Sequence, residues 1–506
     1  MVSLSKEVGA EQFGHDFWED YSVHLSEASF LQGFRATLQR CITVVSACMV
    51  VAGFTPARAG GASSYSETVV YSFKGGSDGV SPQAGLILDK NGTLYGTTSG
   101  DDSTFGTVFR LVPPASGTGA WTETALYSFQ GGSDGVKPLA GVIVDTYGAL
   151  YGTTTYGGRG AGCGSTGCGT VFRLAPPPPG AGPWTETVLY SFQGGNDGIN
   201  PQAGVILDTY GALYGTTTYG GTGTGRCGGE SGCGTVFKLT PPVPPAAQWI
   251  ETVLYSFQGG SDGSAPQAGL IFDTSGALYG TTQSGGSAGY GTVFKLTPPA
   301  PPATQWTETA LYSFQGGSDG AYPYGGVIFD TSGALYGATA IGGTGTNCAS
   351  TGCGTVFRLV PPASGTGAWT ETVLYSFQGG NDGESPLAGV TFDTSGALYG
   401  TTRSGGSSGG SNGIYGNGMV FKLTRPSSTP HFVSQTPWTE TVLYNFQGGN
   451  DGAFPYGGVT FDSRGALYGT TGGGGSSNFG TVIKLQCTVP RGEIIGGTPH
   501  WLPCGQ

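Results

Sequence analysis

The sequence predicts an all-β protein, a seven-bladed β-propeller of four-stranded antiparallel blades. Of 506 residues, 98 are Gly and 31 are Pro, so about a quarter of the chain disfavours helix interiors. Hydrophobic residues make up 37 % and aromatic residues 12 %, which builds a core when they recur in order. They do recur, because one phrase is found seven times, with its central Tyr at 71, 127, 190, 255, 312, 375 and 444. Self-similarity at such a period indicates a repeat fold.

Each copy of the phrase contains four short segments of β-forming residues separated by turn residues. In the copy that begins at Trp306 these segments are 306–314, 326–329, 334–336 and 354–359. A set of four such segments is typical of a four-stranded antiparallel sheet. Seven copies therefore predict seven sheets around one axis.

The phase of the blades follows from one hairpin in the repeat. Asp330 is suited to hold a turn through its carboxylate and Gly333 to adopt positive φ, so 326–336 is expected to form strands a and b. The Gly-Thr-Val-Phe segment is then strand c, and the Trp-Thr-Glu segment is the outer strand d. On this phase the N-terminal strand d at 67–73 completes the last blade, whose a, b and c strands lie in 458–485, and no edge stays exposed. The alternative is that every repeat forms its own blade.

The first sixty residues have a different character. Residues 41–54 form an apolar run that follows Arg35 and Arg40 and precedes Ala57-Arg58-Ala59, which is the layout of a secretory signal. We therefore expect a leader with a signal peptide at 1–59, a propeller at 65–486 and a short tail at 487–506. The alternatives for the apolar run are a buried segment and a lipoprotein cleavage box. No later run is long enough for a transmembrane span.

Three phrases carry a resemblance to a known family. They are Leu-Tyr-Ser-Phe-Gln-Gly-Gly-Ser-Asp-Gly at 311–320, Asp-x-x-Gly-x-Leu-Tyr-Gly at 330–337 and Gly-Thr-Val-Phe at 354–357, each with six counterparts. The chain closely resembles the GloVer tandem repeat of bacterial exported "choice-of-anchor" proteins over 65–486. The resemblance implies a β-propeller-like repeat protein of the cell envelope or exterior, without an assigned activity. Residues 487–506 lack the apolar span or basic cluster of the family's anchors, which favours release or periplasmic residence.

Ten cysteines are present, and two of them, Cys41 and Cys48, fall in the expected leader. The others form four local pairs: Cys163/Cys168, Cys227/Cys233, Cys348/Cys353 and Cys487/Cys504. An even number, local spacing and an export signal indicate disulfides. A metal site is the alternative, but each pair falls in a different repeat with no His nearby, so we predict no metal. Repeats without cysteine carry Phe105, Tyr290 or Phe479 before Gly-Thr, and we expect an aromatic ring to hold the loop there.

Histidine-based chemistry is disfavoured. The four His residues, at 15, 24, 431 and 500, lie outside the repeat strands, which argues against a Ser-His-Asp hydrolase, a Cys-His nucleophile and a His-ligated zinc site. The net charge of −12 argues against nucleic acid as a partner.

Two sets of Asp residues recur in register. One lies in the a–b turn and is expected to hold it: Asp89, Asp145, Asp208, Asp273, Asp330, Asp393 and Asp462. The other lies in Gly-Gly-Ser/Asn-Asp-Gly and is expected to hold a second turn: Asp78, Asp134, Asp197, Asp262, Asp319, Asp382 and Asp451. We predict no cofactor, with Ca²⁺ at this second set as the alternative.

Residues that break the sevenfold pattern are the candidates for a unique site. Tyr322 and Tyr324 flank Pro323, and Phe454 and Tyr456 flank Pro455, where most other repeats carry small or aliphatic residues with Gln or Leu after the Pro. These loops and the b–c loops emerge on one face of a propeller, so we predict that the four aromatics bind a ligand, with stacking on sugar rings as their natural use. The alternative is packing, where Gly325 and Gly457 replace Ala.

The sequence thus predicts an exported, monomeric binding or scaffolding module whose partner is an envelope glycan or a surface protein. Catalysis is less favoured than binding. A carboxylate-dependent glycan-active enzyme is the alternative, and it needs an asymmetric pair of acids on that face, where only Glu230 and Glu384 stand out. A structural spacer is a further alternative.

Overall fold

The computed structural model describes residues 64–499, apart from 102, 118, 179–181, 225, 228–229, 349–350, 366, 408–415, 427–437, 489–493 and 496–497. The expected leader 1–59 lies outside the described residues, and so does Cys504. Within the described ranges, no helix is long and apolar enough to cross a membrane.

Seven four-stranded antiparallel sheets make up the molecule, and each is one blade of a propeller. Strands a, b, c and d are neighbours in that order in every blade. Blades 1 to 6 are β2-β3-β4-β5, β6-β7-β8-β9, β10-β11-β14-β15, β16-β17-β18-β19, β20-β21-β22-β23 and β24-β25-β26-β27. Blade 7 combines β28, β29 and β30 with β1. The predicted fold class is confirmed.

The strands have nearly the same length in each blade. Strands a are β2 (Ile87–Leu88), β6 (Ile143–Val144), β10 (Ile206–Leu207), β16 (Ile271–Phe272), β20 (Ile328–Phe329), β24 (Thr391–Phe392) and β28 (Thr460–Phe461). Strands b are β3 (Leu94–Thr98), β7 (Leu150–Thr154), β11 (Leu213–Thr217), β17 (Leu278–Thr282), β21 (Leu335–Thr339), β25 (Leu398–Thr402) and β29 (Leu467–Thr471). Strands c are β4 (Thr107–Val112), β8 (Thr170–Ala175), β14 (Thr235–Thr240), β18 (Thr292–Thr297), β22 (Thr355–Val360), β26 (Met419–Thr424) and β30 (Thr481–Thr488). Strands d are β1 (Ser64–Ser72), β5 (Thr122–Ser128), β9 (Thr185–Ser191), β15 (Ile250–Ser256), β19 (Thr307–Ser313), β23 (Thr370–Ser376) and β27 (Thr439–Asn445).

Short elements decorate the blades. The 3-10 helices are η1 (Gly76–Asp78), η2 (Ala161–Thr166), η3 (Gly195–Asp197), η4 (Gly317–Asp319) and η5 (Gly380–Asp382). Two small hairpins are β12 (Arg226–Cys227) with β13 (Glu230–Ser231), and β31 (Ile494–Ile495) with β32 (Thr498–Pro499).

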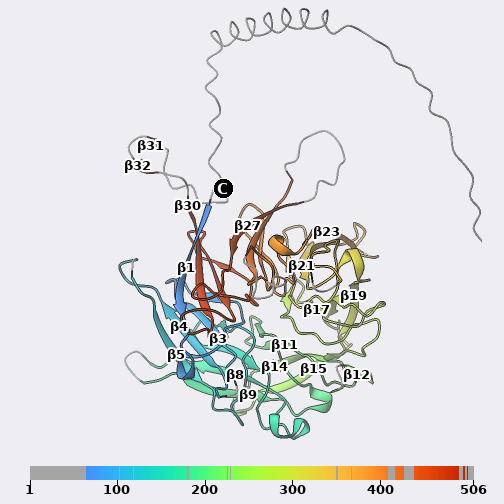
Figure 1. The fold of residues 1–506 in the computed structure, drawn as a ribbon. Coiled ribbons are helices and arrows are strands. Elements are labelled where there is room, and N and C mark those ends of the chain that lie inside the picture. The colour runs from blue at the N-terminus through green and yellow to red at the C-terminus, as the bar shows by residue number, and fades with distance from the viewer. Residues whose placement is uncertain are drawn as a thin grey trace, which may run out of the picture. The chain divides into compact units, whose positions relative to one another are not determined.

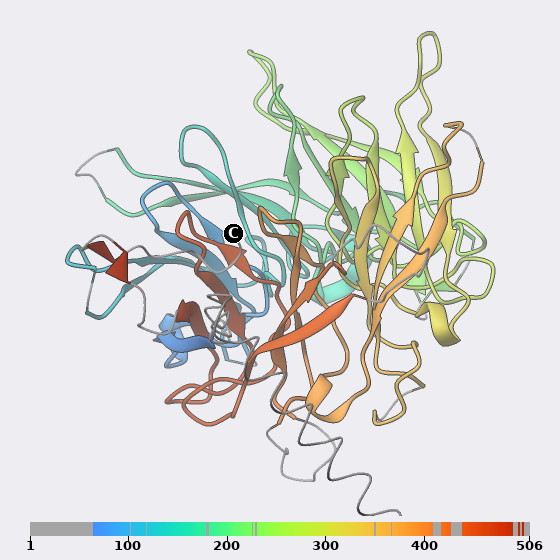
Figure 2. The ribbon, with the colours of Figure 1, turned by 90° about the horizontal axis from the view of Figure 1, so that it is seen from above.

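The ring is closed by the N-terminal strand. β1 runs antiparallel to β30, with Ser64 opposite Thr488 and Ser72 opposite Thr481. Figure 1 shows β1, in blue, beside the red β30, and Figure 2 shows the blue and red strands together from above. This register confirms the predicted phase and rules out the alternative in which every repeat forms its own blade.

The hydrophobic core lies between adjacent blades. Phe192 of the segment after β9 meets Phe237 of β14 edge to face, with 5.1 Å between ring centroids, and both rings are fully buried. The junction between blades 7 and 1 repeats this contact with Phe73 and Phe109, also at 5.1 Å. Four further junctions have the same Phe pair, and Ile483 takes the place of one Phe between blades 6 and 7. Burial of each such ring contributes about 1.5–3 kcal/mol.

Strand a begins close to the axis, and in some blades a side chain would have no room there. A Cβ on Gly141 would lie 2.7 Å from the carbonyl oxygen of Gly85, and one on Gly204 would lie 3.1 Å from that of Gly141. Adjacent blades therefore meet backbone to backbone at these glycines.

Candidate functional site

The sheets present two different ends. Thr107 of β4 lies opposite both Thr98 of β3 and Ser128 of β5, so the b–c loop and the d–a connection of a blade emerge at the same end, called here the top face. The a–b turns lie at the opposite end, called here the bottom face. The predicted aromatics belong to the top face.

The bottom-face Asp residues hold their turns as predicted. Asp208 accepts hydrogen bonds from the backbone N–H groups of Tyr210 at 2.9 Å and Ala212 at 2.8 Å, and from the hydroxyl of Tyr214 at 3.1 Å. Strand-c cations lie close to the equivalent Asp in three other blades, with Arg358 and Asp330 3.7 Å apart. The carboxylates of this register therefore have a structural task.

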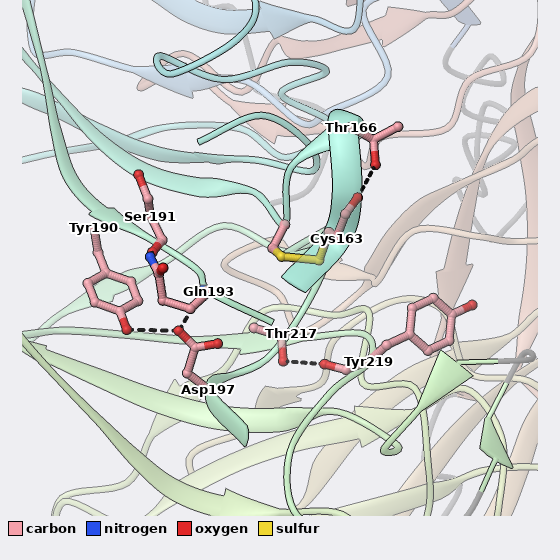
Figure 3. The surroundings of a disulfide bond; sticks show 9 residues. Cys163, Thr166, Tyr190, Ser191, Gln193, Asp197, Thr217 and Tyr219 are labelled. Carbon is pink, nitrogen blue, oxygen red and sulfur yellow. Dashed lines mark hydrogen bonds between the residues drawn. A yellow bond between two sulfur atoms is a disulfide. The ribbon is translucent and has the colours of Figure 1, made fainter. Parts of the chain in front are cut away.

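The second Asp register holds the turns after strands d on the top face. Figure 3 shows Asp197, which accepts hydrogen bonds from the Tyr190 hydroxyl and from the backbone N–H of Gln193, both at 2.8 Å. Equivalent bonds reach Asp134, Asp262, Asp319 and Asp382 in other copies. These donors satisfy the turn role that the sequence predicts, with each carboxylate engaged by Tyr and backbone groups.

The b–c loops of six blades are fixed either by a disulfide or by an aromatic ring, and Asn417 takes this place in blade 6. Disulfides join Cys163 to Cys168, Cys227 to Cys233 and Cys348 to Cys353. Cys487 is also part of a disulfide, and its predicted partner Cys504 lies outside the described residues.

In the remaining repeats, other side chains take the place of the disulfide. A Cβ on Gly259 would lie 2.5 Å from the sulfur of Cys233, whereas one on Gly131 would lie 3.0 Å from the Phe105 ring. Tyr290 and Phe479 occupy the same position against Gly316 and Gly75. An aromatic ring therefore occupies the place of the disulfide in these repeats, as predicted.

One top-face position per blade has a left-handed backbone without being glycine. The residue before the loop proline has φ between 55° and 60° in all seven copies: Ser81, Lys137, Asn200, Ala265, Tyr322, Ser385 and Phe454. We call these seven residues the left-handed ring. Such a conformation costs a non-glycine residue about 1–2 kcal/mol, yet no copy uses glycine. Almost every copy carries a different side chain there, so the fold fixes the backbone and leaves the chemistry of this ring variable.

The first predicted aromatic pair lies where blades 4 and 5 meet. The Tyr322 and Tyr290 rings are tilted against each other with centroids 5.9 Å apart. The Gln283 side chain, which follows β17, donates a hydrogen bond to the Tyr324 hydroxyl at 2.5 Å. Burial raises the pKa of Tyr324. Both tyrosines stay partly exposed.

The second predicted pair lies where blades 6 and 7 meet, and an arginine joins it. The Cζ atom of Arg403, which follows β25, lies 5.2 Å from the centroid of the Tyr456 ring and 5.9 Å from that of Phe454. Phe454 keeps 36 % of its surface exposed. Gly472 of blade 7 leaves room for Tyr456, because a Cβ there would lie 3.0 Å from the ring.

Both pairs follow one plan. A long polar side chain of the preceding blade, Gln283 or Arg403, contacts the Tyr after the proline. The equivalent residue in the blade of that Tyr is small, Ala340 or Gly472. Blade 6, with Ser385 and Leu387, separates the two pairs, so the four aromatics form two clusters.

Neighbouring backbone, rather than an aromatic ring, occupies the space beside the two unusual glycines. A Cβ on Gly325 would lie 2.3 Å from the backbone nitrogen of Gly389, and one on Gly457 would lie 2.6 Å from the carbonyl carbon of Ala84. Glycine is needed there for the close approach of the next blade.

A set of carboxyl pairs between blades escaped the sequence analysis. Each strand d carries one half-buried Glu: Glu67, Glu123, Glu186, Glu251, Glu308, Glu371 and Glu440. Burial, and then the negative charge of Asp197, raise the pKa of Glu251 to about 7, and the other six are raised in the same way by their own Asp. The pairs occur once per blade, which indicates a structural feature rather than one asymmetric pair of acids.

The two acids singled out in the sequence lie in different blades. Glu384 precedes Ser385 and is buried, with its carboxylate within 4.8 Å of the sulfurs of Cys348 and Cys353. Both sulfurs are in a disulfide, so they cannot serve as thiolate ligands of a metal. Glu230 lies in β13, and the structure does not describe its side chain.

Arg403 and Gln283 were missed as well. A signal for them was present, because in the seven copies the third residue after Leu-Tyr-Gly is Ser, Thr, Thr, Gln, Ala, Arg and Gly. The two copies with a long polar residue, Gln283 and Arg403, are the ones that precede the repeats with Tyr322 and Phe454 in the left-handed ring. The meaning of this pattern is clear from the structure, in which these residues contact the following blade.

Together, the seven sheets, the closing strand and the variable top face define a β-propeller repeat protein. The model of the Gloeobacter/Verrucomicrobia repeat matches residues 54–225, 223–412 and 347–492. The chain belongs to this repeat family, which confirms the resemblance seen in its phrases. No curated protein sequence matches the chain significantly.

Solved structures are similar to the chain at low sequence identity. PorZ, an essential bacterial surface component of the type-IX secretion system of Porphyromonas gingivalis, is 12 % identical with a TM-score of 0.42, over 79 % of this chain and 46 % of that chain. This chain thus spans about half the length of PorZ. Two structures of glucose dehydrogenase are 14 % and 16 % identical, with TM-scores of 0.39 and 0.38. They match over 83 % and 66 % of this chain and 99 % and 95 % of their own. These likenesses concern the fold alone.

Proposed function

We propose that this protein is an exported binding module whose top face recognises glycans of the cell envelope. The observation that carries the proposal is the pair of aromatic clusters on the top face, each built from one residue of the left-handed ring and the Tyr after the proline. Four aromatic residues, Tyr322, Tyr324, Phe454 and Tyr456, stand at positions where the other five blades have none, and they remain partly exposed. Flat aromatic faces beside hydrogen-bonding side chains suit the apolar faces and hydroxyl groups of sugars.

Export is supported by chemistry and by the sequence. Three disulfides within the described residues are typical of proteins in oxidising compartments. The apolar run 41–54 has the layout of a secretory signal. We therefore place the proposed binding in the periplasm or at the cell exterior, with 65–486 as the functional body of a monomer.

Binding is favoured over catalysis by the arrangement of acids. The carboxyl pairs of strands d repeat in every blade, and Glu384 lies buried against a disulfide. The top face therefore offers aromatic surface in two places, with no comparable asymmetric arrangement of exposed acids among the described residues.

A glycan-array screen of the purified, oxidised protein tests the proposal. The variant Tyr324→Ala/Tyr456→Ala removes one ring from each cluster, and we expect it to lose at least tenfold in affinity. The matched control is Tyr147→Ala/Tyr210→Ala, which removes two tyrosines of the bottom face that are 87 % and 89 % exposed. Equal binding by both variants, or no glycan binding by folded protein, contradicts the proposal and directs the search to a surface protein.

A further inference from the structure

The strand-c cations of the repeat lie in a common environment, with which Arg403 can be compared. On the bottom side, six strand-c cations stack on the Tyr of strand b: Arg173, Lys238, Lys295, Arg358, Lys422 and Lys484. For three of them the turn Asp lies 3.7 Å away, as with Lys422 and Asp393. Three of the six stacked cations in this register thus have a carboxylate within 4.0 Å.

Arg403 is stacked in the same manner but has a different environment. It lies on the top face over Tyr456 and Phe454, and no described carboxylate comes within 4.0 Å of it. Its Nε atom is buried and has no hydrogen-bond partner among the described residues. Glu384, the acid beside Ser385 in the adjoining loop, has its carboxylate within 4.8 Å of the disulfide sulfurs of the preceding blade instead.

The position of Arg403 is fixed by its backbone. Its N–H donates to the carbonyl of Ser385 at 3.0 Å, and the carbonyl of Phe454 accepts from Gly472 at 3.0 Å. Each blade thus fixes the backbone of its own part of the cluster, and the stacking of Arg403 on Tyr456 and Phe454 joins the two parts. A guanidinium stacked on rings presents its N–H groups outward in a planar fork, which matches a carboxylate better than a neutral group.

We propose that Arg403, Phe454 and Tyr456 form a subsite for a carboxylated sugar, of the uronic acid class. The guanidinium pairs with the sugar carboxylate, and the Tyr456 and Phe454 rings contact the sugar ring. This inference rests on the proposed glycan binding and names its ligand class. The cluster of blades 4 and 5 is the neutral counterpart, since Gln283 stands there in place of Arg403 and donates to Tyr324.

Calorimetric titration with trigalacturonic acid and with its methyl ester tests the inference, because the ester keeps the sugar rings and removes the charge. We expect the acid to bind at least tenfold more tightly than the ester. Arg403→Gln is expected to abolish that preference and Arg403→Lys to retain part of it. Gln283→Arg, which places a guanidinium beside Tyr324, is expected to strengthen binding of the acid.

The outcomes separate this inference from the proposed function. Equal affinity for acid and ester, or an acid preference that survives Arg403→Gln, overturns the carboxylate subsite while glycan binding stands. Binding of neutral glycans alone does the same. If the folded protein binds neither form and no glycan on the array, both proposals fall. Circular dichroism and thermal melting of each variant show that the fold is kept.

Discussion

The two ends of the propeller are built from the same kinds of turn residues, yet they differ in what the repeat keeps constant. On the bottom face, the side chain itself does the structural work, and all seven copies carry Asp with its carboxylate in the turn. At the left-handed ring of the top face, only the backbone conformation is constant, and the side chains range from Ala265 to Lys137 and Phe454. Where a fold demands only a dihedral angle, a repeat is free to diversify its chemistry.

The largest expected difference in stability is between variants of Asp208, on the bottom face, and of Asn200, on the top face of the same repeat. Asp208→Ala leaves three donors without their acceptor and is expected to lower the free energy of unfolding by about 2–3 kcal/mol. Asn200→Ala is expected to change it by less than about 0.5 kcal/mol. Urea denaturation of both variants provides the measurement, and equal losses would contradict the division of labour between the faces.

Next in size is the exchange between cross-link and ring in the top-face loops. Cys227→Ala/Cys233→Ala is expected to cost about 2 kcal/mol, since the closed loop is short. Cys227→Ala/Cys233→Phe rebuilds the aromatic version found at Phe105 and is expected to recover part of that loss. Thermal melting with and without reductant measures both, and a Phe variant no better than the Ala variant argues against interchangeability.

The carboxyl pairs between blades predict that stability falls as the pH rises from about 4.5 to about 7. Over this interval the unfolded chain releases the Glu protons while the folded chain, with its Glu pKa raised to about 7, retains them. Melting temperature is therefore expected to be higher at pH 5.0 than at pH 7.5. Glu251→Gln should raise it by about 1–3 °C at pH 7.5 and have a smaller effect at pH 5.0. Asn200→Ala, which removes no titrating group, serves as the control.

The smallest expected effect concerns the left-handed ring. Lys137→Gly relieves a φ of 57° and is expected to raise the unfolding free energy by about 0.5–1 kcal/mol, whereas Lys137→Ala is not. Matched urea curves decide it, and destabilisation by glycine would show that the Lys137 side chain has a packing role.

Sequence reasoning reached the fold through its periodicity, and the hairpin at Asp330 and Gly333 was enough to set the phase of all seven blades. The disulfides followed from local spacing, and the aromatic substitutes followed from their shared place before Gly-Thr. Arg403 and the Glu of strand d were missed, because their partners belong to another blade, about one repeat away in the chain. Contacts within a repeat can be predicted from the sequence of that repeat, whereas contacts between repeats depend on the curvature of the ring.

The pairing of Ser64 with Thr488 joins residues 424 positions apart, and this has a consequence for biosynthesis. β1 emerges from the ribosome long before β30 exists, so it must wait unpaired while six blades are made. The final blade thus forms only when the chain has been made to the end of β30. A chain cut short anywhere in its last repeat leaves both an unpaired strand and an open ring, which distinguishes unfinished molecules from finished ones for proteases that attack exposed edges.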